Sequence, residues 1–147
     1  MLVMSAMVPN PLTVSADTSV LDLVERVLDS NQTTAVVLDA AGELLGVVSV
    51  EDVLRKIVPN YVNLDSELAS IIHEGYFEEK FAQLAKTRVA EIMTKEVVTV
   101  APTDTMIRAV TMSVHAGHKT FPVIDNGRFV GTITRRSILR CVVPRSV

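Results

Sequence analysis

Apolar residues recur along this 147-residue chain in short runs whose spacing alternates between that of strands and that of helices. A helix is indicated where apolar residues return every three or four positions, and a strand where a short apolar run is bounded by turn residues. We expect Thr18 or Ser19 to cap the first helix and Asp104 to cap its later counterpart. The elements expected in the first half are a strand at 12–14, a helix over 20–28, strands at 35–39 and 44–50, and a short helix from 51.

The same order of elements returns in the second half, because the chain contains an internal repeat. MVPNPLTVSADTSVLDLV (7–24) aligns with MTKEVVTVAPTDTMIRAV (93–110) at an offset of 86 positions, which becomes 85 after the turn where AAGELLG is replaced by NGRFVG. We therefore expect an α/β (α+β) fold of two β-α-β-β-α repeats. Since neither repeat can bury its apolar faces alone, we expect them to pack on a pseudo-twofold axis.

Residues 59–90 interrupt the repeat and divide the chain into repeat 1 (1–58), a helical insert (59–90) and repeat 2 (91–147). The insert reads as two amphipathic helical pieces broken at Gly75. Its charged residues are most simply a solvated face, and the alternative is a lid or a dimer contact.

Composition excludes several classes of function. Fourteen basic and seventeen acidic side chains give a net charge of −3, and Trp is absent, so nucleic-acid binding is not expected. No apolar run reaches the ~18 residues of a membrane span, and the first residues do not resemble a signal peptide. The single cysteine, Cys141, is expected to be a buried structural thiol and fits a cytoplasmic protein.

The two copies of the repeat differ in the motif that carries the candidate binding groups. GVVSVEDVL (46–54) returns as GTITRRSIL (131–139), so that Asp52 is replaced by Ser137. A hydroxyl three residues before a carboxylate suits a ribose diol, and a glycine in the preceding strand lets a ligand approach the backbone. The same Ser-x-x-Asp spacing is equally that of a helix cap.

The repeated frame resembles the cystathionine β-synthase (CBS) domain family. AEIMTKEVVTVAPTDT (90–105), FPVIDNGRFVGTIT (121–134) and GVVSVEDVL (46–54) carry the resemblance. It implies a stand-alone tandem pair, or Bateman module, that binds AMP, ADP, ATP or S-adenosylmethionine as a regulatory ligand. It also implies regulation of a separate partner protein, a homodimer built through apolar helices, and no catalytic cofactor.

The resemblance further implies two clefts, each combining a hydroxyl-x-x-acid motif of one repeat with a base-binding wall of the other. In the main cleft, Val98 and Phe121 would flank an adenine, and a cation near 118–120 would face phosphates. The main cleft is predicted to comprise Ser49, Asp52, Thr94, Val98, His118, Lys119, Thr120, Phe121 and Pro122.

The second cleft lacks the ribose-binding carboxylate, because Ser137 stands in its place. A hydroxyl should weaken ribose recognition by roughly 1–2 kcal/mol. Arg135 and Arg136 would favour phosphate there, unless both are simply solvated. This cleft is predicted to comprise Val8, Leu12, Gln32, Thr33, Thr34, Ala35, Thr134, Arg136 and Ser137.

Other readings of the chain are weaker. His115-x-x-His118 has no third ligand nearby in sequence, so no metal site is expected. A structural dimerisation module with degenerate ligand sites is the alternative function. An enzyme is least favoured, because no base or nucleophile set accompanies Asp52.

Overall fold

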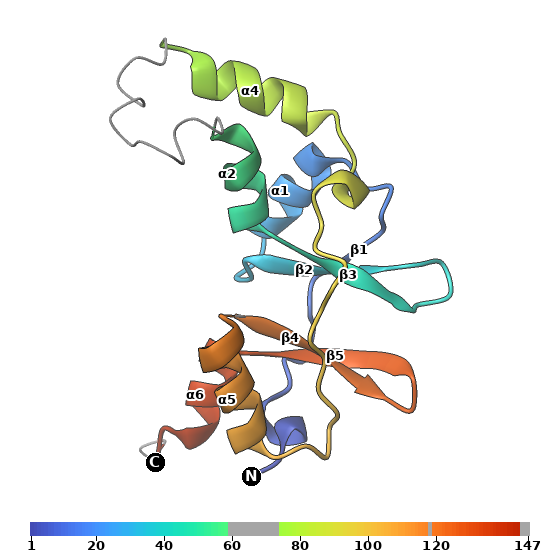
Figure 1. Ribbon diagram of the computed structural model, residues 1–147, viewed down its shortest axis with the longest axis vertical. Helices are drawn as coiled ribbons and strands as arrows, with labels where there is room; N and C mark the ends of the chain where they lie inside the picture. The colour runs from blue at the N-terminus through green and yellow to red at the C-terminus, as the bar shows by residue number, and fades with distance from the viewer. Residues whose placement is uncertain (59–73, 118, 145–147) are drawn as a thin grey trace. The chain divides into compact units, whose positions relative to one another are not determined.

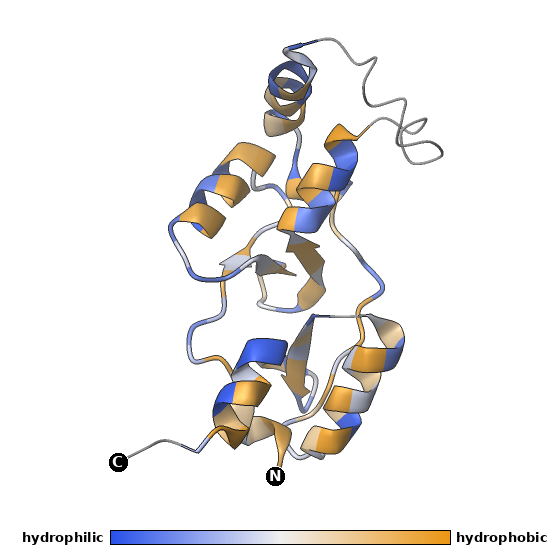
Figure 2. Ribbon diagram, turned by 90° about the vertical axis from the view of Figure 1, so that its left-hand side faces the viewer, coloured by the Kyte–Doolittle hydropathy of each residue, from blue (hydrophilic) through white to orange (hydrophobic). Residues whose placement is uncertain are grey.

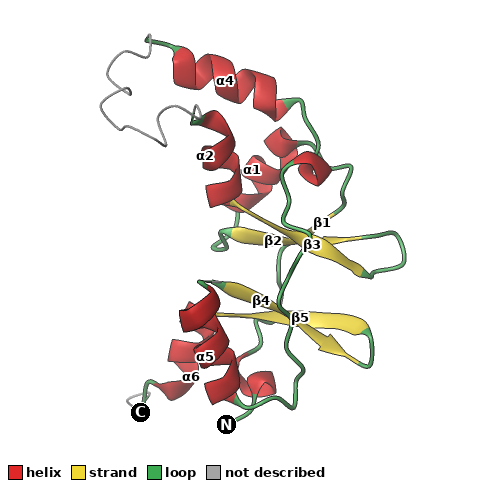
Figure 3. Ribbon diagram, in the orientation of Figure 1, coloured by secondary structure: helices red, strands yellow, loops and turns green. Residues whose placement is uncertain are grey.

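The computed structural model describes residues 1–58, 74–117 and 119–144. Strands and helices follow one another in the order that the repeat predicts, except that the expected first strand of the second copy is reduced to an isolated bridge between Val100 and Val123 (Figures 1 and 3). The first half contains η1 (Val3–Ala6), β1 (Thr13–Val14), α1 (Val20–Leu28), β2 (Thr34–Leu38), β3 (Leu44–Ser49) and α2 (Val50–Ile57). The second half contains α4 (Tyr76–Ala85), η3 (Val89–Glu91), α5 (Met106–Ala116), β4 (Thr120–Asp125), β5 (Arg128–Thr134) and α6 (Arg135–Val142).

The chain forms two compact units, and neither is one continuous stretch of sequence. Unit 1 comprises Met1–Pro11, Leu38–Gly46 and Lys95–Val147, and unit 2 comprises Leu12–Val37 and Val47–Thr94. Each unit has its own apolar core, and each helix alternates between apolar and polar residues along its turns (Figure 2). None of the helices in the described part of the chain combines the length and apolar character needed to cross a bilayer.

Helix α1 shares the core of unit 2 with residues of β2 and β3, and β2 lies between β1 and β3 in a short sheet. The strands β1 and β2 are parallel, with Thr13 opposite Val36. The cap of α1 is Ser19, whose Oγ accepts from the N–H of Asp22 at 3.0 Å. Leu23, one turn further along, is 1% exposed, because the apolar face predicted from the spacing turns inward.

In unit 1, β4 and β5 form an antiparallel hairpin. The turn between them has φ of +51° at Asn126 and +81° at Gly127, the conformation that Asn-Gly favours in two-residue hairpins. The predicted cap by Asp104 is wrong. The Oγ1 of Thr105 accepts from the N–H of Arg108 instead, while the carboxylate of Asp104 accepts from the N–H of Ala101 at 2.8 Å.

The two units exchange equivalent segments of sequence. Residues 3–8 belong to unit 1, where the N–H of Val3 donates to the carbonyl of Asp104 at 2.9 Å. The repeat-equivalent residues 89–94 belong to unit 2, where the N–H of Val89 donates to the carbonyl of Thr18 at 2.8 Å. Val3 and Val89 are both 0% exposed. The core of unit 1 is therefore completed by a segment of repeat 1, and the core of unit 2 by a segment that runs from the insert into repeat 2.

The described part of the insert contains one of its two predicted helices. Helix α4 begins directly after Gly75, whose φ of +87° breaks the chain direction where the sequence predicted a break. Helix α4 contacts α1 and α2, buries Leu84 in the core of unit 2, and donates the Tyr76 hydroxyl to the Ile57 carbonyl at 3.1 Å. The other predicted piece falls within 59–73, outside the described residues.

Candidate functional site

The motif Ser49-x-x-Asp52 forms a reciprocal capping box at the start of α2. The N–H of Ser49 donates to Oδ2 of Asp52 at 2.8 Å, and the N–H of Asp52 donates to Oγ of Ser49 at 3.3 Å. The Ser49 hydroxyl also donates to Oδ2 of Asp52 at 3.1 Å. The helix-cap reading of this motif is therefore realised, and any ligand must use what the cap leaves available.

Asp52 keeps one carboxylate oxygen that the cap does not use. Its Oδ1 accepts from Nη1 of Arg55 at 3.4 Å, and Arg55 holds Glu51 more closely, at 2.9 Å. The side chain of Asp52 is 12% exposed. A carboxylate oxygen has two lone pairs, so Oδ1 can accept a ligand hydroxyl in addition to this long contact.

The equivalent motif in the second copy makes the same cap without a charge. The N–H of Ser137 donates to Oγ1 of Thr134 at 3.0 Å, and the N–H of Thr134 donates to Oγ of Ser137 at 2.8 Å. The Ser137 hydroxyl donates its only proton to the Thr134 carbonyl at 3.0 Å. What remains at Ser137 is one acceptor lone pair on a neutral oxygen, a weaker partner for a ribose than Oδ1 of Asp52.

Two other segments of unit 2 lie beside the start of α2. Thr94 pairs with Val47 through hydrogen bonds of 2.8 and 3.0 Å, two residues before Ser49. The carbonyl of Thr33 accepts from the N–H of Val50 at 3.0 Å. Thr33 and Thr94 are both exposed, so this corner of unit 2 gathers hydroxyl groups from three segments around Asp52.

Unit 1 repeats this corner with different chemistry. Thr120 lies directly opposite Thr134 in the β4–β5 ladder, and the carbonyl of Lys119 accepts from the N–H of Arg135 at 3.3 Å. Val8 pairs with Thr132, as Thr94 pairs with Val47 in unit 2. This corner combines the hydroxyl groups of Thr120 and Thr134 with the cationic residues Lys119 and Arg135.

Within each unit, the loop before a strand lies beside the hydroxyl-x-x motif of the same repeat. In unit 1, Lys119 and Thr120 lie beside Thr134. In unit 2, Thr33 lies beside Ser49. The reason is that the loop before β2 or β4 ends next to the neighbouring strand, which feeds directly into the short helix.

Three predicted contact residues are buried in the cores. Phe121 is 1% exposed within the core of unit 1, so its ring does not provide the adenine-stacking surface that we expected. Ala35, its counterpart in the repeat, is 0% exposed in unit 2, and Pro122 is also fully buried. The side chains at the second positions of β2 and β4 therefore point inward, and only their backbone can reach a ligand.

Two further residues that were predicted to contact the ligand, Gln32 and Val98, contact other residues of their own unit. Gln32 accepts the N–H of Leu12 at 2.9 Å through its side-chain oxygen, which places both residues together in unit 2. Val98 is half-buried against the core of unit 1. Gly131 lies inside β5, where a Cβ would come within 2.7 Å of Cε of Met7, so the space beside it belongs to a side chain rather than to a ligand.

The predicted site residues are thus divided between the units. His118 lies outside the described residues, and no three potential metal ligands gather among those that are described. Of the main cleft, unit 2 holds Ser49, Asp52 and Thr94, and unit 1 holds Val98, Lys119, Thr120, Phe121 and Pro122. Of the second cleft, unit 2 holds Leu12, Gln32, Thr33, Thr34 and Ala35, and unit 1 holds Val8, Thr134, Arg136 and Ser137.

Sequence reasoning missed Arg55, which contacts the proposed ribose acceptor. Its spacing of three residues after Asp52 and four after Glu51 was the available signal, because such pairs meet on a helix surface. It also expected Cys141 to be buried, whereas this thiol is half-exposed and donates to the carbonyl of Ser5 at 2.9 Å.

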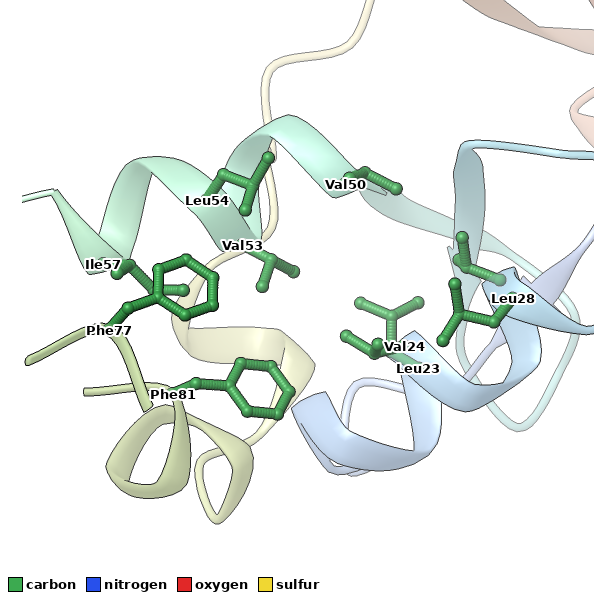
Figure 4. A pocket seen from close by; sticks show the side chains of 10 residues that line it. Leu23, Val24, Leu28, Val50, Val53, Leu54, Ile57, Phe77 and Phe81 are labelled. Carbon is green, nitrogen blue, oxygen red and sulfur yellow. The ribbon is translucent and has the colours of Figure 1, made fainter. Parts of the chain in front are cut away.

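Unit 2 also contains an apolar cavity of about 250 Å³. It lies between α1, α2 and α4, with Phe77 and Phe81 of α4 on one side (Figure 4). Its lining is entirely apolar, in contrast to the hydroxyl-rich corner at Asp52. The remaining lining residues are Leu23, Val24, Val27, Leu28, Val50, Val53, Leu54 and Ile57.

Comparisons with a family model and with solved structures both relate this chain to CBS domains. The family model of the CBS domain matches residues 3–59 and 89–144. The chain is 26% identical over 145 residues to an uncharacterised protein of Methanocaldococcus jannaschii, covering 90% of this chain and 86% of that protein. Among solved structures, the CBS domain of a membrane protein from Sphaerobacter thermophilus is 29% identical, with a TM-score of 0.71 and coverage of 97% and 88%. CBSX2, solved in complex with AMP, is 25% identical, with a TM-score of 0.73 and coverage of 95% and 94%.

Proposed function

Because this chain belongs to the CBS domain family, we propose that it is a regulatory module that binds an adenosine nucleotide (AMP, ADP or ATP) or S-adenosylmethionine and signals to a partner protein. The observation that carries the proposal is Oδ1 of Asp52, a charged acceptor that lies beside exposed hydroxyl groups and that the equivalent corner of the second copy lacks. The complex of the similar CBSX2 with AMP supports the class of ligand.

In this proposal the ribose binds at the start of α2. One ribose hydroxyl group donates to Oδ1 of Asp52, while the Ser49 cap holds the carboxylate in place. The hydroxyls of Thr33 and Thr94 supply further polar contacts. The corner of Thr134 and Ser137 in unit 1 has cations but no carboxylate, so we expect one good nucleotide site per chain.

The test is titration of AMP, ATP and S-adenosylmethionine by calorimetry, with two variants that lose the same cap. Asp52→Ala removes the carboxylate half of the capping box together with the ribose acceptor, and Ser137→Ala removes only the equivalent hydroxyl half in the second copy. Each should lower stability by about 1 kcal/mol. Asp52→Ala should also weaken binding about 10- to 100-fold, since a hydrogen bond to a charged group contributes about 1.5–3 kcal/mol. Equal binding by the two variants, or no binding by the unaltered protein, would refute the site.

A structural dimerisation module with degenerate ligand sites is the second candidate function. It is favoured by one observation: Ser49, Asp52, Thr134 and Ser137 all find partners within their own caps. A folded protein that none of the three compounds stabilises would support this candidate. Hydrolysis of ATP that Asp52→Asn abolishes would instead indicate an enzyme, which we do not propose.

We further propose that the protein is a cytoplasmic homodimer. Leu28, Leu54 and Phe77 are exposed at the apolar cavity of unit 2, and α1 and α2 carry acidic and basic residues in nearly equal number. Such a surface can meet a second copy of itself without repulsion between like charges. Light scattering after size-exclusion chromatography should give twice the mass of one chain, and Phe77→Lys should halve it.

A further inference from the structure

The carboxylate that we assign to ribose binding has a charge that acts on the rest of the ligand as well. The side chain of Asp52 is only 12% exposed, so water screens this charge weakly. In an adenosyl ligand the 5′ carbon and the ribose hydroxyl groups are attached to one furanose ring, which keeps them within a few ångströms of one another. AMP carries a phosphate at this carbon, and S-adenosylmethionine carries a cationic sulfonium. An uncompensated carboxylate would therefore repel AMP and attract S-adenosylmethionine.

Arg55 supplies a compensating charge next to the ribose acceptor. Its Nη1 lies 3.4 Å from Oδ1 of Asp52, and its Nη2 lies 2.9 Å from Oε1 of Glu51. A guanidinium can close on one carboxylate through two parallel hydrogen bonds, but here it is shared between two carboxylates. The cation thus stays beside Oδ1 through one long contact, and a lone pair of this oxygen remains available to a ribose hydroxyl.

The second copy of the repeat has the arginine without the carboxylate. Arg140 is the repeat equivalent of Arg55, and both side chains belong to exposed residues. Three positions before Arg140 stands Ser137 in place of Asp52, and α6 contains no acidic residue. Of these two arginines, Arg55 is therefore the one that lies beside a carboxylate of its own helix. The pair provides a matched comparison of the same charge with and without an acceptor to compensate.

We propose that Arg55 is a specificity-determining residue, which makes the Asp52 corner favour a ligand with a phosphate at the 5′ carbon over one with a sulfonium. Arg55 offsets the charge of Asp52, so the ribose donates to Oδ1 while the phosphate of AMP, ADP or ATP approaches without net repulsion. The inference rests on the proposed ribose site and narrows its ligand to the adenosine phosphates.

The test compares three ligands that share adenine and ribose and differ in the charge at the 5′ carbon: AMP, adenosine and S-adenosylmethionine. Each is titrated into the full chain by calorimetry at about 50 mM NaCl. In Arg55→Gln, the affinity for AMP relative to adenosine should fall about three- to tenfold, and that for S-adenosylmethionine relative to adenosine should rise about two- to fivefold. Both shifts should shrink at about 0.5 M NaCl, because salt screens the charges. A purely structural role of Arg55 would not move the two ratios in opposite directions.

Two variants serve as controls. Arg55→Lys keeps the charge and should hold both affinity ratios within about twofold of those of the unaltered chain. Arg140→Gln removes the same charge at the repeat-equivalent position and should also change both ratios by less than about twofold. Melting temperatures of all three variants should stay within about 3 °C of the unaltered protein, because exposed ion pairs contribute little to stability.

The proposal is overturned if Arg55→Gln changes the affinities for AMP and S-adenosylmethionine by the same factor, or changes neither. An equally large shift in Arg140→Gln would overturn it as well, since the charge would then act from anywhere on the chain.

Failure of the proposed function gives a different result. Asp52→Ala should weaken the binding of adenosine, which carries no charge at the 5′ carbon. If no ligand binds, or if Asp52→Ala leaves adenosine binding unchanged, the ribose site and the role of Arg55 fail together. Binding that depends on Asp52, with no separation of AMP from S-adenosylmethionine by Arg55, would remove this inference and leave the proposed function in place.

Discussion

The exchange of segments predicts that a substitution near the N-terminus destabilises the unit built mainly from the C-terminal half. Val3 is 0% exposed in the core of unit 1. Val3→Ala removes two buried methyl groups, which costs about 1.6 kcal/mol by transfer and about 2 kcal/mol with the cavity that remains. For a chain of this length that corresponds to a fall in melting temperature of about 6 °C. Met4→Ala is the control, because this side chain is 49% exposed and its loss should cost under about 0.5 kcal/mol.

Urea unfolding followed by circular dichroism measures the loss of stability, and hydrogen exchange locates it. Val3→Ala should speed exchange in peptides from 100–134, where the segment bonds to Asp104 and Thr132, and leave 12–37 protected. Val89→Ala should show the opposite pattern, because Val89 completes the core of unit 2. Faster hydrogen exchange in 12–37 after Val3→Ala would refute the proposed placement of residues 3–8 in unit 1. Equal losses of stability in Val3→Ala and Met4→Ala would refute it as well.

Three further substitutions test individual contacts. Ser137→Asp keeps the cap on Thr134 and adds the missing carboxylate, so calorimetry should show a second AMP bound per chain; an unchanged stoichiometry would refute the ribose role of this position. Gly131→Ala places a Cβ 2.7 Å from Cε of Met7 and should cost about 1 kcal/mol, with a smaller cost in a Met7→Ala background, measured as a double-mutant cycle in thermal unfolding. Gly127→Ala should cost about 1–2 kcal/mol in the same assay, because φ is +81° there; a neutral result would contradict the strained turn.

Local patterns in the sequence determined most elements of this protein. The apolar spacing of 20–28, the Asn126-Gly127 turn and the two hydroxyl-x-x motifs each involve residues within a few positions of one another, so their structures follow from neighbours along the chain. The repeat likewise showed that the two copies differ at Asp52 and Ser137. The resemblance to CBS domains, carried by short motifs, indicated the family that the comparison establishes.

Only the tertiary structure decided which residues share a surface. The division of the sequence places 3–8 in repeat 1 and 89–94 across the end of the insert and the start of repeat 2, but Val3 is buried in unit 1 and Val89 in unit 2. Lys119 lies beside Thr134, and the ring of Phe121 faces the core. These outcomes depend on contacts between residues distant in sequence, which a periodic pattern does not encode. The sequence thus placed a carboxylate at Asp52, and the fold determined that one of its oxygens remains available to a ligand.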